Sequence, residues 1–232
     1  MYFILQKSQN EKIDDNKTTQ IIYTNNLNSY ILCKNLIDDY IKNGLFESNI
    51  IEWSRQFCRS DKIFLDIGAH TGTYSISLYK NCKHVYSYEP QKMTYYALCG
   101  SVALSNCDNI TCYNFGLGSD TQTGENILNI PSIDGGGSSI CQLSNIIRQE
   151  KVDIKTLDSL NCLDISFIKI DVEGNELSTL KGSINTLKRN NLPHILFECN
   201  DCNNNKELFN FLTDIGYKCN NIGVWNMFLA FK

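Results

Sequence analysis

The stretch KIFLDIGAHTGTYS, residues 62–75, decides the fold. Its first half is a continuous apolar run that ends in Gly68, which is typical of a strand buried on both faces of a parallel sheet. Gly68 and Gly72 follow, and they allow the backbone to pass close to a ligand while the N-terminus of a helix opens toward it. The sequence therefore predicts a strand, a ligand-binding turn and a helix over residues 73–80.

Downstream of this turn, strand and helix patterns alternate. The pattern predicts strands at 84–89, 109–115, 165–171 and 194–199 and helices at 92–105, 176–188 and 208–215, with an irregular stretch in the middle of the chain. Two apolar runs close the chain, and no room is left for a helix between them, so they predict an antiparallel hairpin. We expect an α/β fold with a doubly wound, seven-stranded sheet.

Residues 1–60 precede this pattern and contain no recognisable chemical motif. Residues 21–33 predict two short strands around a turn, and residues 36–45 and 48–58 place apolar side chains at helical spacing. We expect a small N-terminal α+β extension over residues 1–60. A ligand-binding domain is expected over residues 61–232, with an insertion at 117–164.

The composition excludes several classes of function. The net charge is -4, with 21 Lys and Arg against 25 Asp and Glu and no basic run, which argues against a grip on nucleic acid. The N-terminal apolar run is too short for a signal peptide or a membrane span. The 11 cysteines are odd in number and scattered, as in a reduced, cytoplasmic protein. Cys199 and Cys202 have no second pair that would complete a zinc site.

Ligands of a doubly wound sheet bind beyond the carboxyl ends of its strands. His70 occupies the position of the middle glycine of a dinucleotide-binding loop, which disfavours NAD and FAD. Asp66 precedes the loop and would attract a cation rather than a phosphate. Glu89, followed by Pro90, ends the next strand and is placed to accept hydrogen bonds from two ribose hydroxyls. This combination indicates S-adenosylmethionine, a nucleoside with a cationic sulfonium.

The same motifs resemble the FkbM family of S-adenosylmethionine-dependent methyltransferases. The resemblance runs in order from about Leu45 to Glu198 and rests on DIGAHTGTYS (66–75), YEP (88–90), NFGLGS (114–119), GGGSS (135–139), VDIKTLDSL (152–160), FIKIDVEGNELSTLKGS (167–183) and ILFE (195–198). The family commonly has Asn where this chain has His70. The resemblance implies a class I methyltransferase fold, Rossmann-like, whose last strand runs antiparallel. It also implies O-methylation of a hydroxyl on a sugar, a glycan or a related small molecule.

The resemblance and the strand-end rule together give the candidate site residues. The expected cofactor-binding residues are Asp66, Gly68, Ala69, His70, Gly72, Tyr74, Glu89, Pro90, Phe115, Gly116, Leu117 and Asp171.

Asp171 and Glu173 are the expected catalytic residues, because a sugar hydroxyl is a poor acid and needs a general base or a cation. Glu173 is either that base or a cap of the following helix. Asp171, Glu198 and Asn200 are alternatively the ligands of a Mg²⁺ ion. Lys169 is expected to be a buried partner of a charged group, and residues 133–140 are flexible enough to close over a substrate.

Three functions are consistent with these residues. The first is an O-methyltransferase that acts by in-line displacement on a small-molecule or glycan acceptor. The second is a catalytically idle S-adenosylmethionine-fold module that serves as a binding or scaffold subunit. The third is a nicotinamide-dependent oxidoreductase, which His70 disfavours. The pattern predicts no membrane insertion and no nucleic-acid partner, and it leaves a homo-oligomer open.

Overall fold

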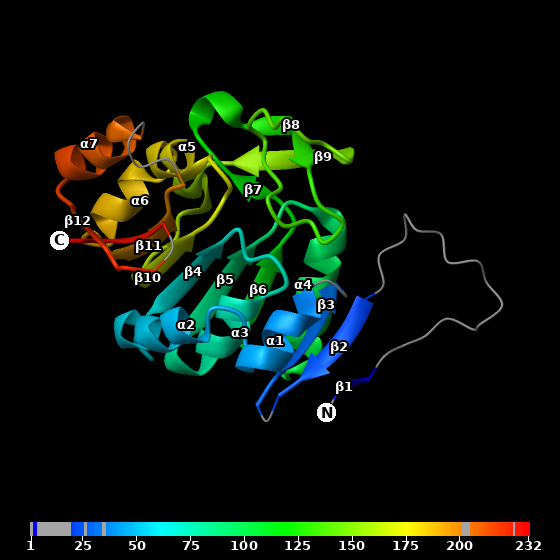
Figure 1. The fold of residues 1–232 in the computed structure, drawn as a ribbon. Helices are drawn as coiled ribbons and strands as arrows, with labels where there is room; N and C mark the ends of the chain where they lie inside the picture. The colour runs from blue at the N-terminus through cyan, green and yellow to red at the C-terminus, as the bar shows by residue number, and fades with distance from the viewer. Residues whose placement is uncertain (1, 4–19, 26, 34–35, 201–204, 225) are drawn as a thin grey trace.

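The structure is a computed structural model that describes the chain except for residues 1, 4–19, 26, 34–35, 201–204 and 225 (Figure 1). Its core is a seven-stranded sheet in the order β12–β13–β11–β10–β4–β5–β6. The strands are β4 (Ile63–Ile67), β5 (His84–Tyr88), β6 (Ile110–Tyr113), β10 (Ile165–Ile170), β11 (His194–Glu198), β12 (Lys218–Asn221) and β13 (Met227–Phe231).

The pairing of these strands confirms the predicted topology. Strands β11, β10, β4, β5 and β6 pair in parallel, whereas β13 runs antiparallel to both β11 and β12. The strand order reverses between β4 and β10, because β5 and β6 extend the sheet on one side of β4 and β10 and β11 extend it on the other. A ligand site is expected at this switch point.

Helices cover both faces of the sheet. They are α1 (Ile37–Asn43), α2 (Ser48–Ser54), α3 (Thr73–Leu78), α4 (Lys92–Leu104), α5 (Glu176–Lys181), α6 (Ile184–Arg189) and α7 (Lys206–Ile215). Helices α2 and α3 pack against one face, and α5, α6 and α7 pack against the other. Within the described ranges, no helix has the length and hydropathy to cross a bilayer.

The single helix predicted at 176–188 is wrong, because the structure divides it into α5 and α6 at Gly182 and Ser183. Gly182 lies against the backbone of the insertion, where an added Cβ would stand 2.0 Å from the carbonyl oxygen of Gly118. The carbonyl of Gly182 also accepts a hydrogen bond from the backbone N–H of Asp158, at 3.0 Å. Contacts with a distant segment therefore interrupt the helix.

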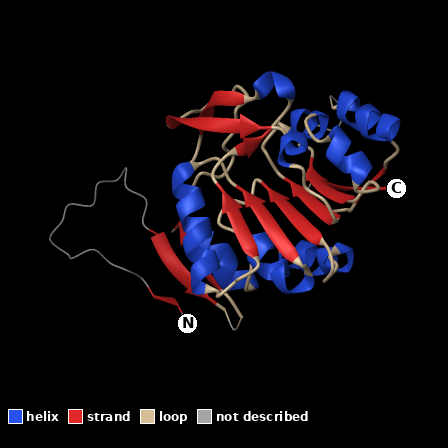
Figure 2. Cartoon of the chain, turned by 180° about the vertical axis from the view of Figure 1, so that it is seen from behind, coloured by secondary structure: helices blue, strands red, loops and turns tan. Residues whose placement is uncertain are grey.

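The irregular stretch predicted in the middle of the chain is also wrong. It contains a second sheet in the order β7–β9–β8, formed by β7 (Gly116–Leu117), β8 (Gly124–Ile130) and β9 (Arg148–Lys155). This insertion takes the place of a crossover helix, so no described helix covers one face of the sheet at its β5–β6 end. Figure 2 shows this face toward the viewer. Tyr86 and Tyr113 lie in the resulting aromatic groove.

The N-terminal segment forms a third sheet. The predicted hairpin is present as β2 (Gln20–Thr24) and β3 (Ser29–Cys33), and β1 (Tyr2–Phe3) adds a strand to it. Strand β3 packs on α4, where the hydroxyls of Ser101 and Ser105 accept the backbone N–H groups of Ile31 and Ser29 at 2.8 and 2.9 Å. These side chains satisfy the edge of the small sheet and attach it to the main domain.

We expect Gly182→Ala to destabilise the fold by about 1–3 kcal/mol, because the new Cβ meets backbone that cannot move aside. The melting temperature should fall by several degrees. Gly100→Ala is the matched control. Gly100 lies inside helix α4, and the new Cβ would meet only the flexible end of the Ile31 side chain. Alanine is the better helix former, so this control should be neutral or stabilising. Equal melting temperatures for the two variants would contradict the assigned contact.

Candidate active site

A cavity of about 340 Å³ opens beyond the carboxyl ends of β4, β5, β10 and β11. The predicted site residues that line it are Gly68, Ala69, His70, Tyr74, Glu89, Pro90, Gly116, Leu117, Asp171, Glu173 and Glu198. The structure thus brings most of the sequence-predicted residues to one place. Asp66, Gly72, Phe115 and Asn200 are not among the residues that line the cavity.

The turn after β4 forms the floor of this cavity. Gly68 has a positive φ of 77°, and an added Cβ would lie 1.8 Å from the carbonyl oxygen of Asp171, so only glycine fits. His70 also has a positive φ, 49°, a conformation in which Asn and His are enriched. Its backbone N–H donates to Oε2 of Glu89 at 2.9 Å. The turn after β4 is therefore tied to the ends of both neighbouring strands.

Glu89 is buried beside this turn, immediately after β5. Its Oε1 accepts the backbone N–H of Gln91 at 2.8 Å, and its Oε2 accepts that of His70. Burial raises the pKa of the Glu89 carboxyl to about 7, although the two N–H groups act in the opposite direction. Each carboxylate oxygen retains a lone pair. The residue can therefore accept two further hydrogen bonds, as the pair of ribose hydroxyls requires.

Asp66 and Gly72 support the turn from below. Asp66 is fully buried, and its Oδ2 accepts hydrogen bonds from the backbone N–H and the hydroxyl of Ser75 in helix α3, at 3.0 and 2.5 Å. Burial raises the pKa of Asp66, and the nearby Lys169 ammonium opposes that rise. Gly72 is the N-cap of α3, with a φ of 91°. These two residues hold the loop against the helix, and their contact with a cofactor stays a prediction.

Lys169 is a buried cation at the centre of the site. Its Nζ donates to Oδ2 of Asp171 at 3.0 Å and to the carbonyl of Gly68 at 3.2 Å, and it lies 5.1 Å from the ring centre of Tyr74. Burial by itself disfavours the charged form, but the carboxylates of Asp171, Asp66 and Glu47 outweigh it and raise the pKa of Lys169. The predicted pairing of Lys169 with a charged group is confirmed.

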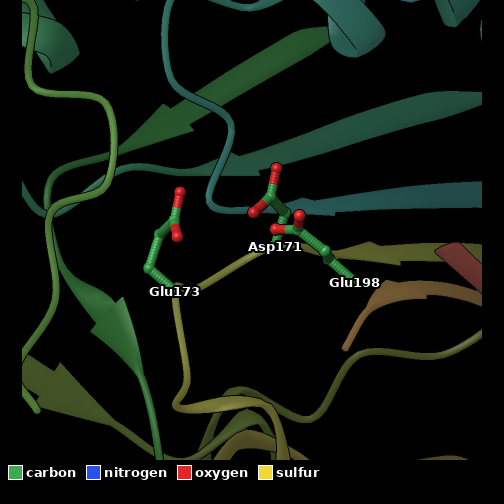
Figure 3. A group of neighbouring side chains, drawn as sticks. All are labelled: Asp171, Glu173 and Glu198. Atoms are coloured by element: carbon green, nitrogen blue, oxygen red, sulfur yellow. The ribbon is translucent and has the colours of Figure 1, made fainter. Parts of the chain in front are cut away.

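Three carboxylates that line the cavity lie close together, and Figure 3 shows their side chains. One oxygen each from Asp171, Glu173 and Glu198 lies within 4.8 Å of the other two. Burial, followed by the charges of Asp171 and Glu173, raises the pKa of Glu198 to about 7. Burial and the charge of Asp171 likewise raise the pKa of Glu173. This cluster can bind a proton or a cation near neutral pH.

The carboxylate cluster differs in one member from the predicted Mg²⁺ ligands. Asp171 and Glu198 belong to it, and Glu173 joins them. Asn200 is exposed, and its Oδ1 accepts a hydrogen bond from Nδ2 of Asn226 at 3.1 Å.

The glycine-rich loop at residues 133–140 lies across the cavity. His70 Nε2 donates to the carbonyl of Asp134 at 3.2 Å, which joins one end of the loop to the turn after β4. At the other end, the Ser139 hydroxyl donates to the carbonyl of Glu173 at 2.6 Å. Gly137 contributes to the wall of the cavity between these contacts. The loop therefore touches both the predicted cofactor turn and the carboxylate cluster.

The sequence did not predict that the N-terminal segment lines part of the cavity. Leu36, Tyr40, Phe46 and Glu47 line it from the N-terminal segment. Nothing in the sequence singles these residues out, because they belong to an ordinary amphipathic pattern without a motif. Only their position above the sheet makes them part of the site.

Comparisons with known proteins identify a family for this chain. A family model described as "Methyltransferase FkbM domain" matches residues 66–219. A search of curated protein sequences found no significant match.

Several solved structures that are described as methyltransferases or methylases are similar to this chain. A methyltransferase FkbM from Methylobacillus flagellatus is 20% identical with a TM-score of 0.52, and the match covers 75% of this chain and 44% of that one. A precorrin-6y C5,15-methyltransferase from Geobacter metallireducens is 12% identical (TM-score 0.49, coverage 79% and 88%). An rRNA methylase from Streptococcus thermophilus is 13% identical (TM-score 0.49, coverage 78% and 91%). The chain thus spans less than half of the FkbM structure, and that likeness establishes the fold alone.

We expect Lys169→Met to destabilise the fold by about 3–5 kcal/mol, because it leaves buried carboxylates without their cation. Unfolding in urea measures this loss. Carboxyl groups with raised folded-state pKa values bind protons more readily in the folded than in the unfolded state, so lowering the pH from about 8 to about 5 should restore part of the lost stability. Lys62→Met is the control, since it removes a pair with the exposed Asp164 and should change stability by about 1 kcal/mol or less. A loss at Lys169 that does not depend on pH would contradict the assigned charge network.

Proposed function

The chain belongs to the FkbM family of S-adenosylmethionine-dependent methyltransferases, and we propose that it transfers the methyl group to a hydroxyl oxygen of a sugar or glycan acceptor. The observation that carries this proposal is the placement of the carboxylate cluster. Asp171, Glu173 and Glu198 lie in the same cavity as the nucleoside-binding turn, so a base can stand next to the reacting methyl group.

The residues present fit the cofactor that the family uses. The cradle at Gly68 has no space for a Cβ, and Glu89 keeps two lone pairs for ribose hydroxyls. Asp171 stands at the cofactor end of the carboxylate cluster and is suited to an amino group. When bound, the cofactor supplies an electrophilic methyl carbon on a sulfonium, so the protein has only to align the acceptor and remove its proton.

Glu173 is the residue that we assign as the general base. Asp171 is held by the Lys169 ammonium, and the Asn200 side chain favours the charged form of Glu198, so neighbouring side chains act on both carboxylates. Burial raises the pKa of Glu173 above its ordinary value, which makes its carboxylate a stronger base for the proton of the acceptor. Alignment of the acceptor hydroxyl with the methyl carbon contributes about 7–11 kcal/mol. The loop at 133–140 excludes water above this position.

The charge of the cavity supports a neutral acceptor. Lys169 supplies the one ammonium among the described residues that line it, whereas the carboxylates that line it belong to Glu47, Glu89, Asp134, Asp171, Glu173 and Glu198. A polyanion would be repelled by this wall, so a nucleic acid is disfavoured and a sugar hydroxyl is favoured. We propose in addition that the protein acts in the cytoplasm. A homo-oligomer is compatible with this function.

Exchange of the base for an amide tests the proposal. With an acceptor found by screening nucleotide sugars, free glycans and lipid-linked glycans for release of S-adenosylhomocysteine, Glu173→Gln should lower kcat by about 10²–10⁴. In the wild type kcat should rise with pH as the carboxyl loses its proton, and the variant should lose this rise. Glu207→Gln, an exposed change on α7, is the control and should leave kcat unchanged.

Calorimetry then measures whether Glu173→Gln still binds the cofactor product. Binding of S-adenosylhomocysteine to Glu173→Gln at wild-type affinity would show that only the chemical step is lost. Full activity of that variant would contradict the assignment of the base. A wild-type protein that binds S-adenosylhomocysteine but methylates no acceptor would instead favour the idle binding module.

A divalent cation is the alternative way to acidify the hydroxyl, and the spacing of the three carboxylates favours it as a second candidate. Asp171, Glu198 and Glu173 would hold the ion, and Asn200 is the amide ligand that the sequence predicts in addition. If Glu173 is the base, activity should be unchanged after dialysis against EDTA. Loss of activity in EDTA that Mg²⁺ restores would replace the base by a cation-assisted reaction.

A further inference from the structure

Glu47 is a carboxylate of the N-terminal segment that reaches the cofactor end of the cavity. It is the N-cap of helix α2 and has a positive φ of 52°. This conformation is uncommon for a residue other than Gly, Asn, Asp or His, and such strain concentrates at functional sites. The carbonyl of Glu47 accepts the N–H of Ile51 at 3.0 Å, so the strained residue is fixed to the first turn of α2.

The side chain of Glu47 is held on the wall of the cavity by one buried hydroxyl. Tyr74 Oη donates to Glu47 Oε2 at 2.7 Å, and Tyr74 is buried. The ring of the same tyrosine lies beneath the Lys169 ammonium. Lys169 in turn contacts Asp171 and the carbonyl of Gly68. Glu47 therefore shares one corner of the cavity with the two backbone turns that flank the predicted cofactor.

Negative charge exceeds positive charge in this corner. Lys169 is the buried cation there, and the carboxylates of Asp171, Asp66 and Glu47 all act on it. Burial also disfavours the charged form of Glu47 itself, since it raises the pKa of that carboxyl. A ligand that brings an ammonium group into the corner would compensate the excess charge. Under the proposed function, the amino-acid end of the cofactor carries such a group.

We propose that Glu47 is a cofactor-binding residue that receives this ammonium group together with Asp171. The inference rests on the proposed function and assigns a binding role to a segment for which the sequence offered no motif. The N-terminal extension then completes the cofactor site rather than only covering the sheet. The role is selective, because Glu47 would recognise the charge of the ligand and not its nucleoside.

Two ligands that differ only in the amino group test this role by calorimetry. The probes are S-adenosylhomocysteine and its analogue in which hydrogen replaces the amino group while the carboxylate is retained. Glu47→Gln should weaken S-adenosylhomocysteine about tenfold and leave the affinity of the analogue within about twofold, which corresponds to the loss of one charge-assisted contact. Glu52→Gln, an exposed change five residues further on, should alter neither affinity.

Other outcomes separate this inference from the proposed function. Unchanged binding of S-adenosylhomocysteine to Glu47→Gln would overturn the role of Glu47 and leave the methyltransferase proposal intact. Equal losses for both ligands would also overturn it, because they would indicate a structural role. A wild-type chain that binds neither ligand would overturn the proposed function and this inference with it. Tyr74→Phe removes the hydrogen bond that holds the Glu47 carboxylate. We expect this variant to lose affinity for S-adenosylhomocysteine but not for the analogue, and to lose less affinity than Glu47→Gln.

Discussion

The buried ammonium of Lys169 is the interaction on which the rest of the site depends. It lies between the turn after β4 and the turn after β10, and it bonds to the carbonyl of Gly68 and the carboxylate of Asp171. A charged lysine in this position is stable only because carboxylates surround it. It therefore fixes the spacing of these two turns, which form the proposed cofactor site. The same charge allows Asp66 to stay buried beneath the turn after β4.

Much of the fold could be predicted because its strands are buried on both faces. Strands β4 and β10 appear in the sequence as mostly apolar runs, and the glycines after β4 mark the turn. The insertion could not be predicted in the same way, since β8 and β9 bury only part of their side chains and the first four residues of β9, 148–151, are all polar. The break between α5 and α6 could not be predicted from the sequence for another reason. It depends on Gly182 meeting Gly118, two residues far apart in the chain.

The candidate site divides along similar lines. Glu89, Asp171 and Glu198 follow strands, so the rule that ligands bind at carboxyl ends of strands was enough to select them. His70 stood out as a departure from the family, and its left-handed backbone gives a reason why both Asn and His can occupy the position. Glu47 follows no strand. It enters the site only because the N-terminal helices pack over the sheet, a relation that no local pattern of residues encodes.

The loop at 133–140 connects the two chemical tasks of the cavity. His70 belongs to the turn that we propose faces the nucleoside, and Glu173 belongs to the carboxylate cluster that we propose faces the acceptor. The loop bonds to His70 through Asp134 and to Glu173 through Ser139. Because Ser139 holds the backbone of Glu173, which itself has a positive φ of 53°, the position of the proposed base depends on where the loop lies. The loop therefore links the proposed cofactor turn to the proposed base, because the same segment bonds to both.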